Sequence, residues 1–244
     1  MLSKFRSLLF YGTFYLSALL IFIVFLPAIL VSRRLTQVAL KLWSRAIFGG
    51  LKWAVGLTWE AKGLEHIPSE PCIFACKHQS AWETGIFYLL VKDPAFVLKK
   101  ELLSIPLFGW YLKSSGAIPI DREAGAGAIK QLVKEARDRL ENGQNIVIFP
   151  EGTRSSGMYH PGVAAIYNNV SAPVIPVALN SGVFWPRNGL EKRPGCVTIE
   201  FLPAMDKGLK RREFMSALQE RIDEKSTDLV KHARLKGAGA GPSR

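Results

Sequence analysis

The stretch Ala75-Cys76-Lys77-His78-Gln79-Ser80-Ala81-Trp82-Glu83-Thr84-Gly85 decides how the rest of the chain is interpreted. It follows a short apolar run, Cys72 to Ala75, which predicts a buried strand, and it precedes Ile86 to Val91, which predicts a helix. His78 and Glu83 are therefore expected at a strand-to-helix turn, where side chains converge on a ligand. A histidine beside a carboxylate suits a general base, because the acid fixes the tautomer and stabilises the imidazolium.

The spacing of the two residues also bears on local structure. His78 and Glu83 meet only if the histidine lies in the turn and the glutamate in the first helical turn, since on one helix they would face different sides. Ser80 supports this arrangement, because Ser-x-x-Glu before an apolar run is a capping-box signature with Ser80 as N-cap. The spacing alone leaves two interpretations open: Glu83 is only a helix cap and His78 an ordinary loop residue, or the pair is catalytic.

Three further blocks follow in order along the chain. They are Gly116 to Arg122 (GAIPIDR), Phe149 to Ser155 (FPEGTRS) and Val174 to Ala178 (VIPVA). Together with His78-x4-Glu83 they resemble the four sequence blocks of the glycerolipid acyltransferases, over residues 63–203. The FPEGTRS block is highly specific, and the other blocks gain their weight as an ordered set.

Short predicted strands alternate with predicted helices over residues 58–235, and this alternation indicates an α/β domain. The clearest helix is Ala126 to Asn142, which has a continuous apolar face. The resemblance implies the glycerol-3-phosphate acyltransferase-like fold, a mixed sheet flanked by helices. Residues 236–244 are predicted to be a disordered tail.

The N-terminal region has the pattern of a membrane anchor. Leu8 to Val31 is an apolar run of 24 residues without a charge, long enough to cross a bilayer. A signal peptide is disfavoured, because the run is too long and no small-x-small cleavage site follows before Arg33. Leu35 to Thr58 has the pattern of a basic amphipathic helix lying in the interface. We therefore predict membrane-embedded and interfacial helices over 1–57. The resemblance implies a two-helix anchor, and a full span and a hairpin in one leaflet both remain open.

The net charge of +12 lies mainly at the two ends, with +6 over residues 1–60, +2 over 61–202 and +4 over 203–244. The nearly neutral middle argues against a nucleic-acid partner, and the basic ends favour anionic membrane lipids or an acidic carrier protein. The three cysteines give no paired framework, which predicts reduced thiols and a catalytic domain on the cytosolic side of the inner membrane. Cys72-x3-Cys76 lacks a fourth ligand at the usual spacing, so no metal is expected.

The chemistry expected at His78 is direct acyl transfer. No Gly-x-Ser-x-Gly nucleophile motif occurs, and Cys76 is poorly placed to attack, so an acyl-enzyme is disfavoured. The resemblance implies that His78, assisted by Glu83, removes the proton from the sn-2 hydroxyl of 1-acyl-glycerol-3-phosphate, which is lysophosphatidic acid. That oxygen then attacks the thioester of acyl-CoA or acyl-carrier protein and gives phosphatidic acid. The thioester is already activated, so we expect no cofactor.

The anionic acceptor requires cations, and arginine makes bidentate contacts with phosphate. The predicted phosphate-binding residues lie in the motif blocks and after one predicted strand: Arg154, Arg122, Lys99, Lys100, Glu151, Gly152 and Thr153. For Glu151 two roles stay open, because it either holds an arginine in place or contacts the glycerol.

The chain departs from the family pattern at two positions. Members commonly have Asn before the histidine and Asp as the acid, whereas this chain has Lys77 and Glu83. An inward Lys77 would disfavour the imidazolium or meet a phosphate, and strand alternation equally allows an outward one. The alternatives to the predicted reaction are acylation of glycerol-3-phosphate, lyso-ornithine lipid or another lyso-lipid, and a non-catalytic membrane lipid-binding protein.

Overall fold

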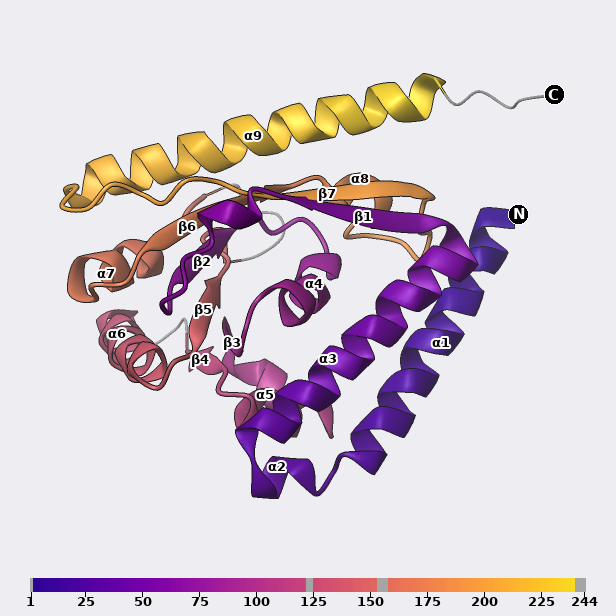
Figure 1. Cartoon of the computed structure of the whole chain (residues 1–244), viewed down its shortest axis with the longest axis horizontal. Coiled ribbons are helices and arrows are strands. Elements are labelled where there is room, and N and C mark those ends of the chain that lie inside the picture. Colours follow the sequence, from indigo (N-terminus) through magenta and orange to yellow (C-terminus); the bar gives the residue numbers. More distant parts are fainter. Residues whose placement is uncertain (1, 122–124, 153–157, 240–244) are drawn as a thin grey trace.

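The structure is a computed structural model of the chain, and it describes residues 2–121, 125–152 and 158–239. Within these residues, seven strands form one sheet: β1 Leu57–Lys62, β2 Ile73–Cys76, β3 Pro94–Lys99, β4 Ile118–Ile120, β5 Asn145–Ile148, β6 Val174–Leu179 and β7 Gly195–Phe201. Their order is β1-β7-β6-β2-β5-β3-β4 (Figure 1). Strand β7 is antiparallel to β6, and the other described pairs are parallel. The predicted α/β class with a mixed sheet is confirmed.

Helices cover both faces of the sheet. One face carries α6 (Gly125–Glu141), α7 (Gly162–Asn169) and α9 (Arg211–Gly239). The other face carries α1 (Leu2–Val24), α3 (Arg33–Gly50) and α4 (Trp82–Leu90). The remaining elements are short: α2 Ala28–Val31, η1 Leu51–Val55, η2 Leu64–His66, η3 Lys100–Ser104, α5 Phe108–Ser114 and α8 Ser181–Phe184.

Strand β2 shows why the sheet has two separate cores. Ile73 and Ala75 point into the core formed with α6, α7 and α9, whereas Phe74 and Cys76 point into the core formed with α1, α3 and α4. Successive side chains of a strand point to opposite faces, and all four are fully buried. A parallel strand covered on both faces is therefore apolar at every position, as this one is.

The N-terminal segment folds as a helical hairpin. Helix α1 ends at Val24, a turn containing Pro27 follows, and α2 leads into α3, which runs back along α1 (Figure 1). The apolar run predicted over residues 8–31 is thus divided between two helices, because proline cannot continue a helix from within it. Helix α3 lies between α1 and α4 and buries Leu40 and Ile47.

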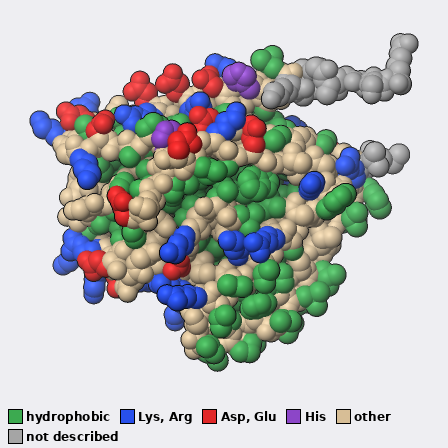
Figure 2. Space-filling view, in the orientation of Figure 1, with side chains coloured by type: hydrophobic (Ala, Val, Ile, Leu, Met, Phe, Trp, Pro, Cys, Tyr) green, Lys and Arg blue, Asp and Glu red, His purple; other side chains and the backbone are tan. Residues whose placement is uncertain are grey.

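The hairpin presents an apolar surface outward. In the part of the chain that the structure describes, Ser3–Val24 is long and apolar enough to cross a membrane, and only 17% of its most apolar window is buried. Figure 2 shows hydrophobic side chains gathered over α1 and α2, with basic side chains beside them. The exposed side chains include Leu16, Leu20, Ile23, Leu30 and Val31. An apolar patch of this kind marks an interaction surface, and its length and composition indicate membrane association.

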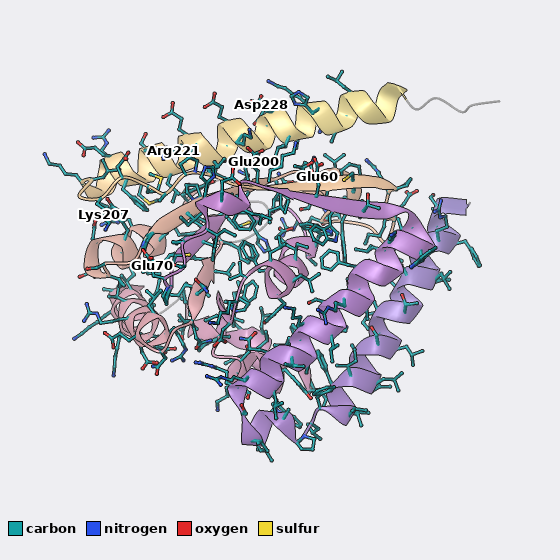
Figure 3. The ribbon with its side chains drawn as sticks, viewed as in Figure 1. Glu60, Glu70, Glu200, Lys207, Arg221 and Asp228 are labelled. Carbon is teal, nitrogen blue, oxygen red and sulfur yellow. The ribbon has the colours of Figure 1, made fainter. Side chains whose placement is uncertain are left out.

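The opposite side of the molecule is highly charged. Figure 3 shows Arg221 and Asp228 on α9 and Glu60 and Glu200 on the strands beneath it. Helix α9 continues to Gly239, so its last residues overlap the tail predicted at 236–244, and residues 240–244 lie outside the described residues. The molecule is therefore apolar along the hairpin and polar along α9.

Candidate active site

The candidate site lies at the carboxyl edge of the sheet. Strands β6, β2, β5, β3 and β4 are parallel neighbours, so their carboxyl ends meet at one edge. His78 follows β2, Glu151 follows β5, Ser181 follows β6, and Lys99 is the last residue of β3. Open α/β sheets bind ligands in the crevice outside this edge, which explains why motif blocks distant in sequence converge here.

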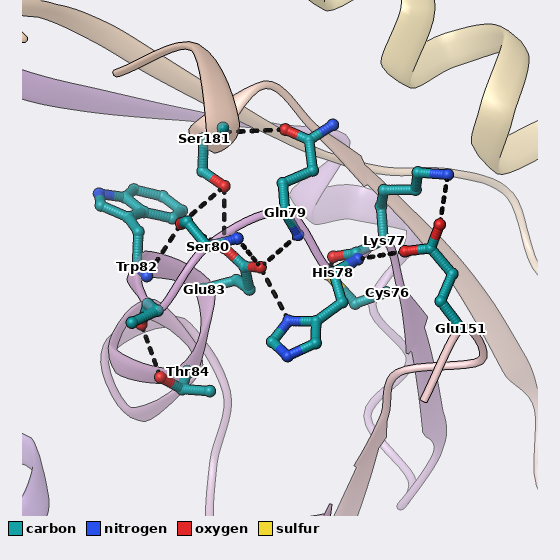
Figure 4. A network of polar contacts seen from close by, with 12 residues as sticks. Cys76, Lys77, His78, Gln79, Ser80, Trp82, Glu83, Thr84, Glu151 and Ser181 are labelled. Carbon is teal, nitrogen blue, oxygen red and sulfur yellow. Dashed lines mark hydrogen bonds and ion pairs between the residues drawn. The ribbon is translucent and has the colours of Figure 1, made fainter. Parts of the chain in front are cut away.

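His78 and Glu83 are in direct contact. The distance between His78 Nδ1 and Glu83 Oε1 is 3.0 Å, and Figure 4 shows the second ring nitrogen turned away from the carboxylate. Glu83 is fully buried and its Oε1 also accepts hydrogen bonds from the backbone N–H groups of Gln79 and Ser80, both at 2.7 Å. Its Oε2 lies 2.9 Å from Ser80 Oγ and accepts from Ser181 Oγ at 2.8 Å.

These contacts keep the Glu83 carboxylate ionised. Burial alone would raise the pKa of Glu83, but hydrogen bonds from His78, Ser80 and Ser181 and the charge of the imidazolium outweigh it. The pKa of Glu83 therefore lies below its ordinary value. A carboxylate on Nδ1 holds the proton there, so that Nε2 of His78 is the nitrogen able to accept a proton.

Glu83 also caps the helix that carries it. Helix α4 begins at Trp82 with Ala81 as N-cap, one residue later than the predicted cap at Ser80. Ser80 Oγ nevertheless accepts a hydrogen bond from the Trp82 N–H at 3.0 Å, and Glu83 accepts one from the Ser80 N–H. The cap and the contact with His78 therefore coexist on one carboxylate, and the catalytic interpretation of the pair stays a prediction.

The FPEGTRS block contacts His78 from β5. The Phe149 ring stacks on the imidazole with centroids 4.1 Å apart and planes at 21°. Glu151 Oε2 accepts a hydrogen bond from the backbone N–H of His78 at 3.0 Å, and its Oε1 lies 2.7 Å from Lys77 Nζ. Lys77 extends away from the imidazole toward α9, where its Nζ lies 2.8 Å from Asp223 Oδ1 (Figure 4). Lys77 thus adopts the outward orientation that strand alternation allowed.

Cys76 has the properties of an inert thiol. It is fully buried, and burial, followed by the negative charges of Glu83 and Glu151, raises its pKa well above the ordinary value. Its Sγ lies 3.2 Å from the backbone oxygen of Lys77. A buried, protonated thiol is a poor nucleophile, which argues against an acyl-enzyme on this residue. Within the described residues, no group of three or more His, Cys, Asp and Glu side chains is placed to hold a metal ion.

A large cavity opens beside His78. Its volume is about 1250 Å³, and it extends from the imidazole between the hairpin and α4. The lining is mostly apolar and aromatic, and it includes Phe14, Phe22, Trp43, Ile47, Tyr88 and Phe108. A cavity of this kind accepts a long apolar group and places one end of it next to the histidine.

Only some of the predicted phosphate-binding residues line the cavity in the part of the chain that the structure describes. Lys99 and Gly152 line the same cavity as His78. Lys100 forms an ion pair with Asp121, and Glu151 contacts Lys77 and the His78 backbone. Three predicted residues lie outside the described residues: Arg122, Thr153 and Arg154.

Several residues at the site were not predicted. Ser181 donates to Glu83, and the only sequence signal for it is its place just after the carboxyl end of a predicted strand. Phe149 lies inside the FPEGTRS block, but its stacking on His78 has no counterpart in the sequence pattern. His160 and Arg187 also line the cavity. Arg187 lies in a Pro-Arg-Asn-Gly segment that indicates a turn rather than a ligand contact.

Comparisons with known proteins agree with these observations. A family model described as Acyltransferase matches residues 59–180. A 1-acyl-sn-glycerol-3-phosphate acyltransferase from Pseudomonas aeruginosa is 38% identical over 185 residues, which are 74% of this chain and 72% of that protein. One from Cocos nucifera is 30% identical over 157 residues, 62% of this chain and 51% of that protein. The crystal structure of a 1-acyl-sn-glycerophosphate acyltransferase from Thermotoga maritima has the same fold, with a TM-score of 0.74, 22% identity, and coverage of 99% and 100% of the two chains.

Proposed function

The chain belongs to the acyltransferase family, and from this membership we propose that it acylates the sn-2 hydroxyl of 1-acyl-glycerol-3-phosphate to give phosphatidic acid. One observation carries the chemistry: His78, held through Nδ1 by Glu83 at 3.0 Å, lines an apolar cavity of about 1250 Å³. The names of the relatives support the acceptor, and the cavity beside the histidine supports a substrate with a long acyl chain.

In the proposed mechanism His78 acts as the general base. Its Nε2 accepts the proton of the acceptor hydroxyl while that oxygen attacks the carbonyl carbon of the thioester. The tetrahedral intermediate then expels the thiolate, which takes a proton from the imidazolium and leaves as a thiol. Glu83 lowers the energy of the imidazolium because its charge lies against Nδ1. General base catalysis of this kind contributes about 10²- to 10⁴-fold to the rate.

The proposed acyl donor is a thioester, either acyl-CoA or acyl-carrier protein. Its carbonyl is already activated, so proton transfer and positioning by the protein suffice and the reaction needs no further cofactor. The apolar part of the cavity, lined by Phe22 and Trp43, is the proposed site for an acyl chain. The inert state of Cys76 supports direct transfer from donor to acceptor.

The phosphate of the acceptor is proposed to bind beside the cavity. Lys99 and Gly152 line it, and Gly152 has φ +65°, which favours glycine. Arg154, Arg122 and Thr153 remain proposed ligands of the phosphate on the strength of the motif blocks. We propose a minor role for Lys100, which pairs with Asp121. For Glu151 we propose positioning rather than phosphate contact, because its carboxylate would repel the anion.

The proposed site of action is the surface of the inner membrane, on its cytosolic side. The exposed apolar face of α1 and the excess of Lys and Arg near both ends of the chain support binding to anionic lipids. The acceptor and the product are themselves lipids with acyl chains. An enzyme docked at the membrane therefore receives lysophosphatidic acid and releases phosphatidic acid without passing either through water.

A defined assay tests the proposal. The full chain in lipid vesicles is given labelled acyl-CoA or acyl-carrier protein with a panel of acceptors: 1-acyl-glycerol-3-phosphate, glycerol-3-phosphate, lyso-ornithine lipid and lysophosphatidylcholine. We expect labelled phosphatidic acid from the first acceptor, and loss of nearly all product with His78→Ala. Product from another acceptor alone would overturn the proposed substrate, and undiminished transfer by His78→Ala would overturn the mechanism.

A further inference from the structure

A chain of charged contacts joins the C-terminal helix to the backbone of His78. Asp223 of α9 lies 2.8 Å from Lys77 Nζ, and the same Nζ lies 2.7 Å from Glu151 Oε1. The other oxygen of Glu151 accepts a hydrogen bond from the His78 backbone N–H at 3.0 Å. Figure 4 shows Lys77 and Glu151 lying between His78 and the ribbon of α9. Three elements distant in sequence are thus connected at the histidine.

We call the contacts among Asp223, Lys77 and Glu151 the relay, and two of its members are largely withdrawn from water. The side chains of Lys77 and Glu151 are 19% and 5% exposed, and Tyr159 OH donates to Asp223 at 3.3 Å. Burial lowers the pKa of Lys77, but the hydrogen bonds with Asp223 and Glu151 outweigh this and raise it above its ordinary value. Lys77 is therefore a permanent cation, and removing it would take one charged partner away from the buried Glu151 carboxylate.

The position of Lys77 argues against a role in binding substrate. His78 lines the cavity, whereas neither Lys77 nor Asp223 is among the described residues that do so. Lys77 forms ion pairs with two carboxylates, those of Glu151 and of Asp223 on α9. A positioning effect of Lys77 on a reaction in the cavity therefore passes through Glu151 and the His78 backbone.

We propose that Lys77 and Asp223 are positioning residues for His78. Asp223 orients Lys77, Lys77 fixes Glu151, and Glu151 holds the backbone N–H of His78 so that the imidazole stays between Glu83 and Phe149. The three charges of this group also set the local field, because one cation and two carboxylates give a net charge of −1 near the base. The inference rests on the proposed function, since it takes His78 to be the general base.

Other titratable groups lie around His78 and Lys77 on the surrounding elements. Glu83 lies on α4, Cys76 ends β2, and Tyr159 precedes α7. Further groups line the cavity, namely Lys99, His160 and Arg187. The proposed test leaves all of these unchanged and alters only the charge of the relay from Asp223 to Glu151.

The two ends of the relay have opposite effects on the base. Lys77→Met raises the net negative charge near His78, favours the imidazolium, and moves the acid limb of the kcat/KM profile to higher pH. Asp223→Asn keeps a hydrogen-bond acceptor but removes a negative charge, and it moves the acid limb to lower pH. Each shift is expected to be about half a pH unit, the scale of one partly screened charge. The double variant restores the net charge of −1 and returns the limb close to its original position.

Positioning is measured separately from charge. Lys77→Met is expected to lower kcat about tenfold with little change in KM, because misplacing a catalytic group slows the reaction without removing a substrate contact. Lys77→Arg retains the cation and is expected to recover part of the loss. A merely structural role for Lys77 would lower the melting temperature without moving the pH profile.

The matched control is Lys225→Met. Lys225 also extends from α9 to the sheet and forms an ion pair of 2.7 Å with Glu200, but it has no contact with the His78 group within the described residues. Its rate and pH profile are expected to equal those of the unmodified chain. Thermal melting of each variant in the same vesicles shows whether it folds.

The outcomes separate the relay from the proposed function. Acid limbs that stay in place, or that move the same way in Lys77→Met and Asp223→Asn, overturn the relay when the unmodified chain is active and depends on His78. No product from the unmodified chain, or full activity of His78→Ala, overturns the proposed function instead. If Lys77→Met does not fold, the pH profile of Asp223→Asn still tests the relay. Asp223 is 36% exposed and asparagine has the same shape as aspartate, so this variant should fold.

Discussion

At the scale of single residues, the Glu83 carboxylate is the most constrained group of the site. Its Oε1 contacts His78 Nδ1 and accepts hydrogen bonds from two backbone N–H groups, and its Oε2 accepts hydrogen bonds from two hydroxyl groups. All five neighbours are able to donate, so the ionised form is stabilised despite complete burial. The orientation of the His78 ring and the start of α4 therefore depend on one side chain.

Glu83→Gln is expected to fold and to lose most activity. The amide oxygen can replace Oε1, and the amide nitrogen can donate to the hydroxyls of Ser80 and Ser181, which rotate to accept. A neutral amide does not stabilise the imidazolium, so kcat should fall about 100-fold or more. Thermal melting and initial rates measure the two effects. Ser181→Ala, which keeps the charge, is the control and should lose less than about 10-fold. Near-normal turnover of Glu83→Gln would leave Glu83 as a cap only.

Cys76→Ala is expected to leave acyl transfer almost unchanged. The thiol is buried and protonated, so it contributes packing rather than nucleophilicity. Initial rates and mass spectrometry of the protein during turnover with acyl-CoA are the measurements. A trapped acyl-protein that disappears in the variant would show a covalent intermediate and would contradict direct transfer.

Which site residues were predictable depends on how far apart in the chain their partners are. The contact of His78 with Glu83 spans five residues, so a local pattern of capping box and turn was enough to predict it. The contact of Lys77 with Asp223 spans 146 residues, and that of Ser181 with Glu83 spans 98. Such pairs form only when the carboxyl ends of β2 and β6 meet and α9 packs on the sheet, and no spacing in the sequence encodes that meeting.

At the scale of elements, the connections that bring the strands together are as important as the strands. Strand β1 is followed directly by Gly63, which has φ +68° and lies against the backbone of Phe201 at the end of β7. A Cβ at this position would lie 1.9 Å from the Phe201 carbonyl oxygen. The close approach of two backbones therefore requires glycine here, and the turn directs the chain from β1 toward β2.

Gly63→Ala is expected to destabilise the fold without touching the cavity. Positive φ and the clash with a backbone oxygen together should lower the free energy of unfolding by about 3 kcal/mol. Chemical denaturation monitored by tryptophan fluorescence measures the change. Gly143→Ala is a useful comparison, because Gly143 also has positive φ but no atom within 4 Å of the added Cβ, and it should cost about 1 kcal/mol. Equal losses in the two variants would contradict the role of the close approach.

Long elements were predicted more accurately than short ones. The helix predicted over 126–142 is found within a residue of its predicted bounds, because its apolar period is long and uninterrupted, and the strand predicted over 72–75 is found one residue later. Helix α8 was missed, since four residues carry no period. The sequence also left open whether the apolar run spans the membrane or lies in a hairpin within one leaflet. The structure shows that α3 packs against α1 and α4, and both membrane arrangements stay predictions.

At the scale of the whole molecule, polarity is divided between two sides. The hairpin of α1 and α3 exposes apolar side chains, whereas α9 and the strands beneath it carry charged ones (Figures 2 and 3). The cavity that contains His78 is lined by α1 and α3 on one side and by the sheet edge on the other. The surface proposed to dock on lipid therefore adjoins the cavity proposed to receive the lipid substrate.

Leu16→Glu with Leu20→Glu is expected to release the chain from membranes. Both side chains are more than half exposed on α1, at 58% and 55%, so charge there is tolerated by the fold but not by a lipid interior. Vesicle affinity should fall about 10-fold or more for each leucine replaced. Flotation with anionic and neutral vesicles measures it. Leu235→Glu on α9, which is 71% exposed on the charged side, is the control. Unchanged flotation of the α1 variant would show that this face does not meet lipid.

Glu83 Oε1 contacts both the His78 ring and the first turn of α4. This shared contact links activity to local folding, both when the protein first folds and when it is heated. With His78 as the proposed base, a newly made chain is expected to become active only when that turn closes, so partly folded molecules should be inactive. Heating is expected to inactivate the mature protein in the same way. When the first turn of α4 unfolds locally, the His78 ring loses its contact with Glu83, so turnover should cease at a lower temperature than the sheet unfolds.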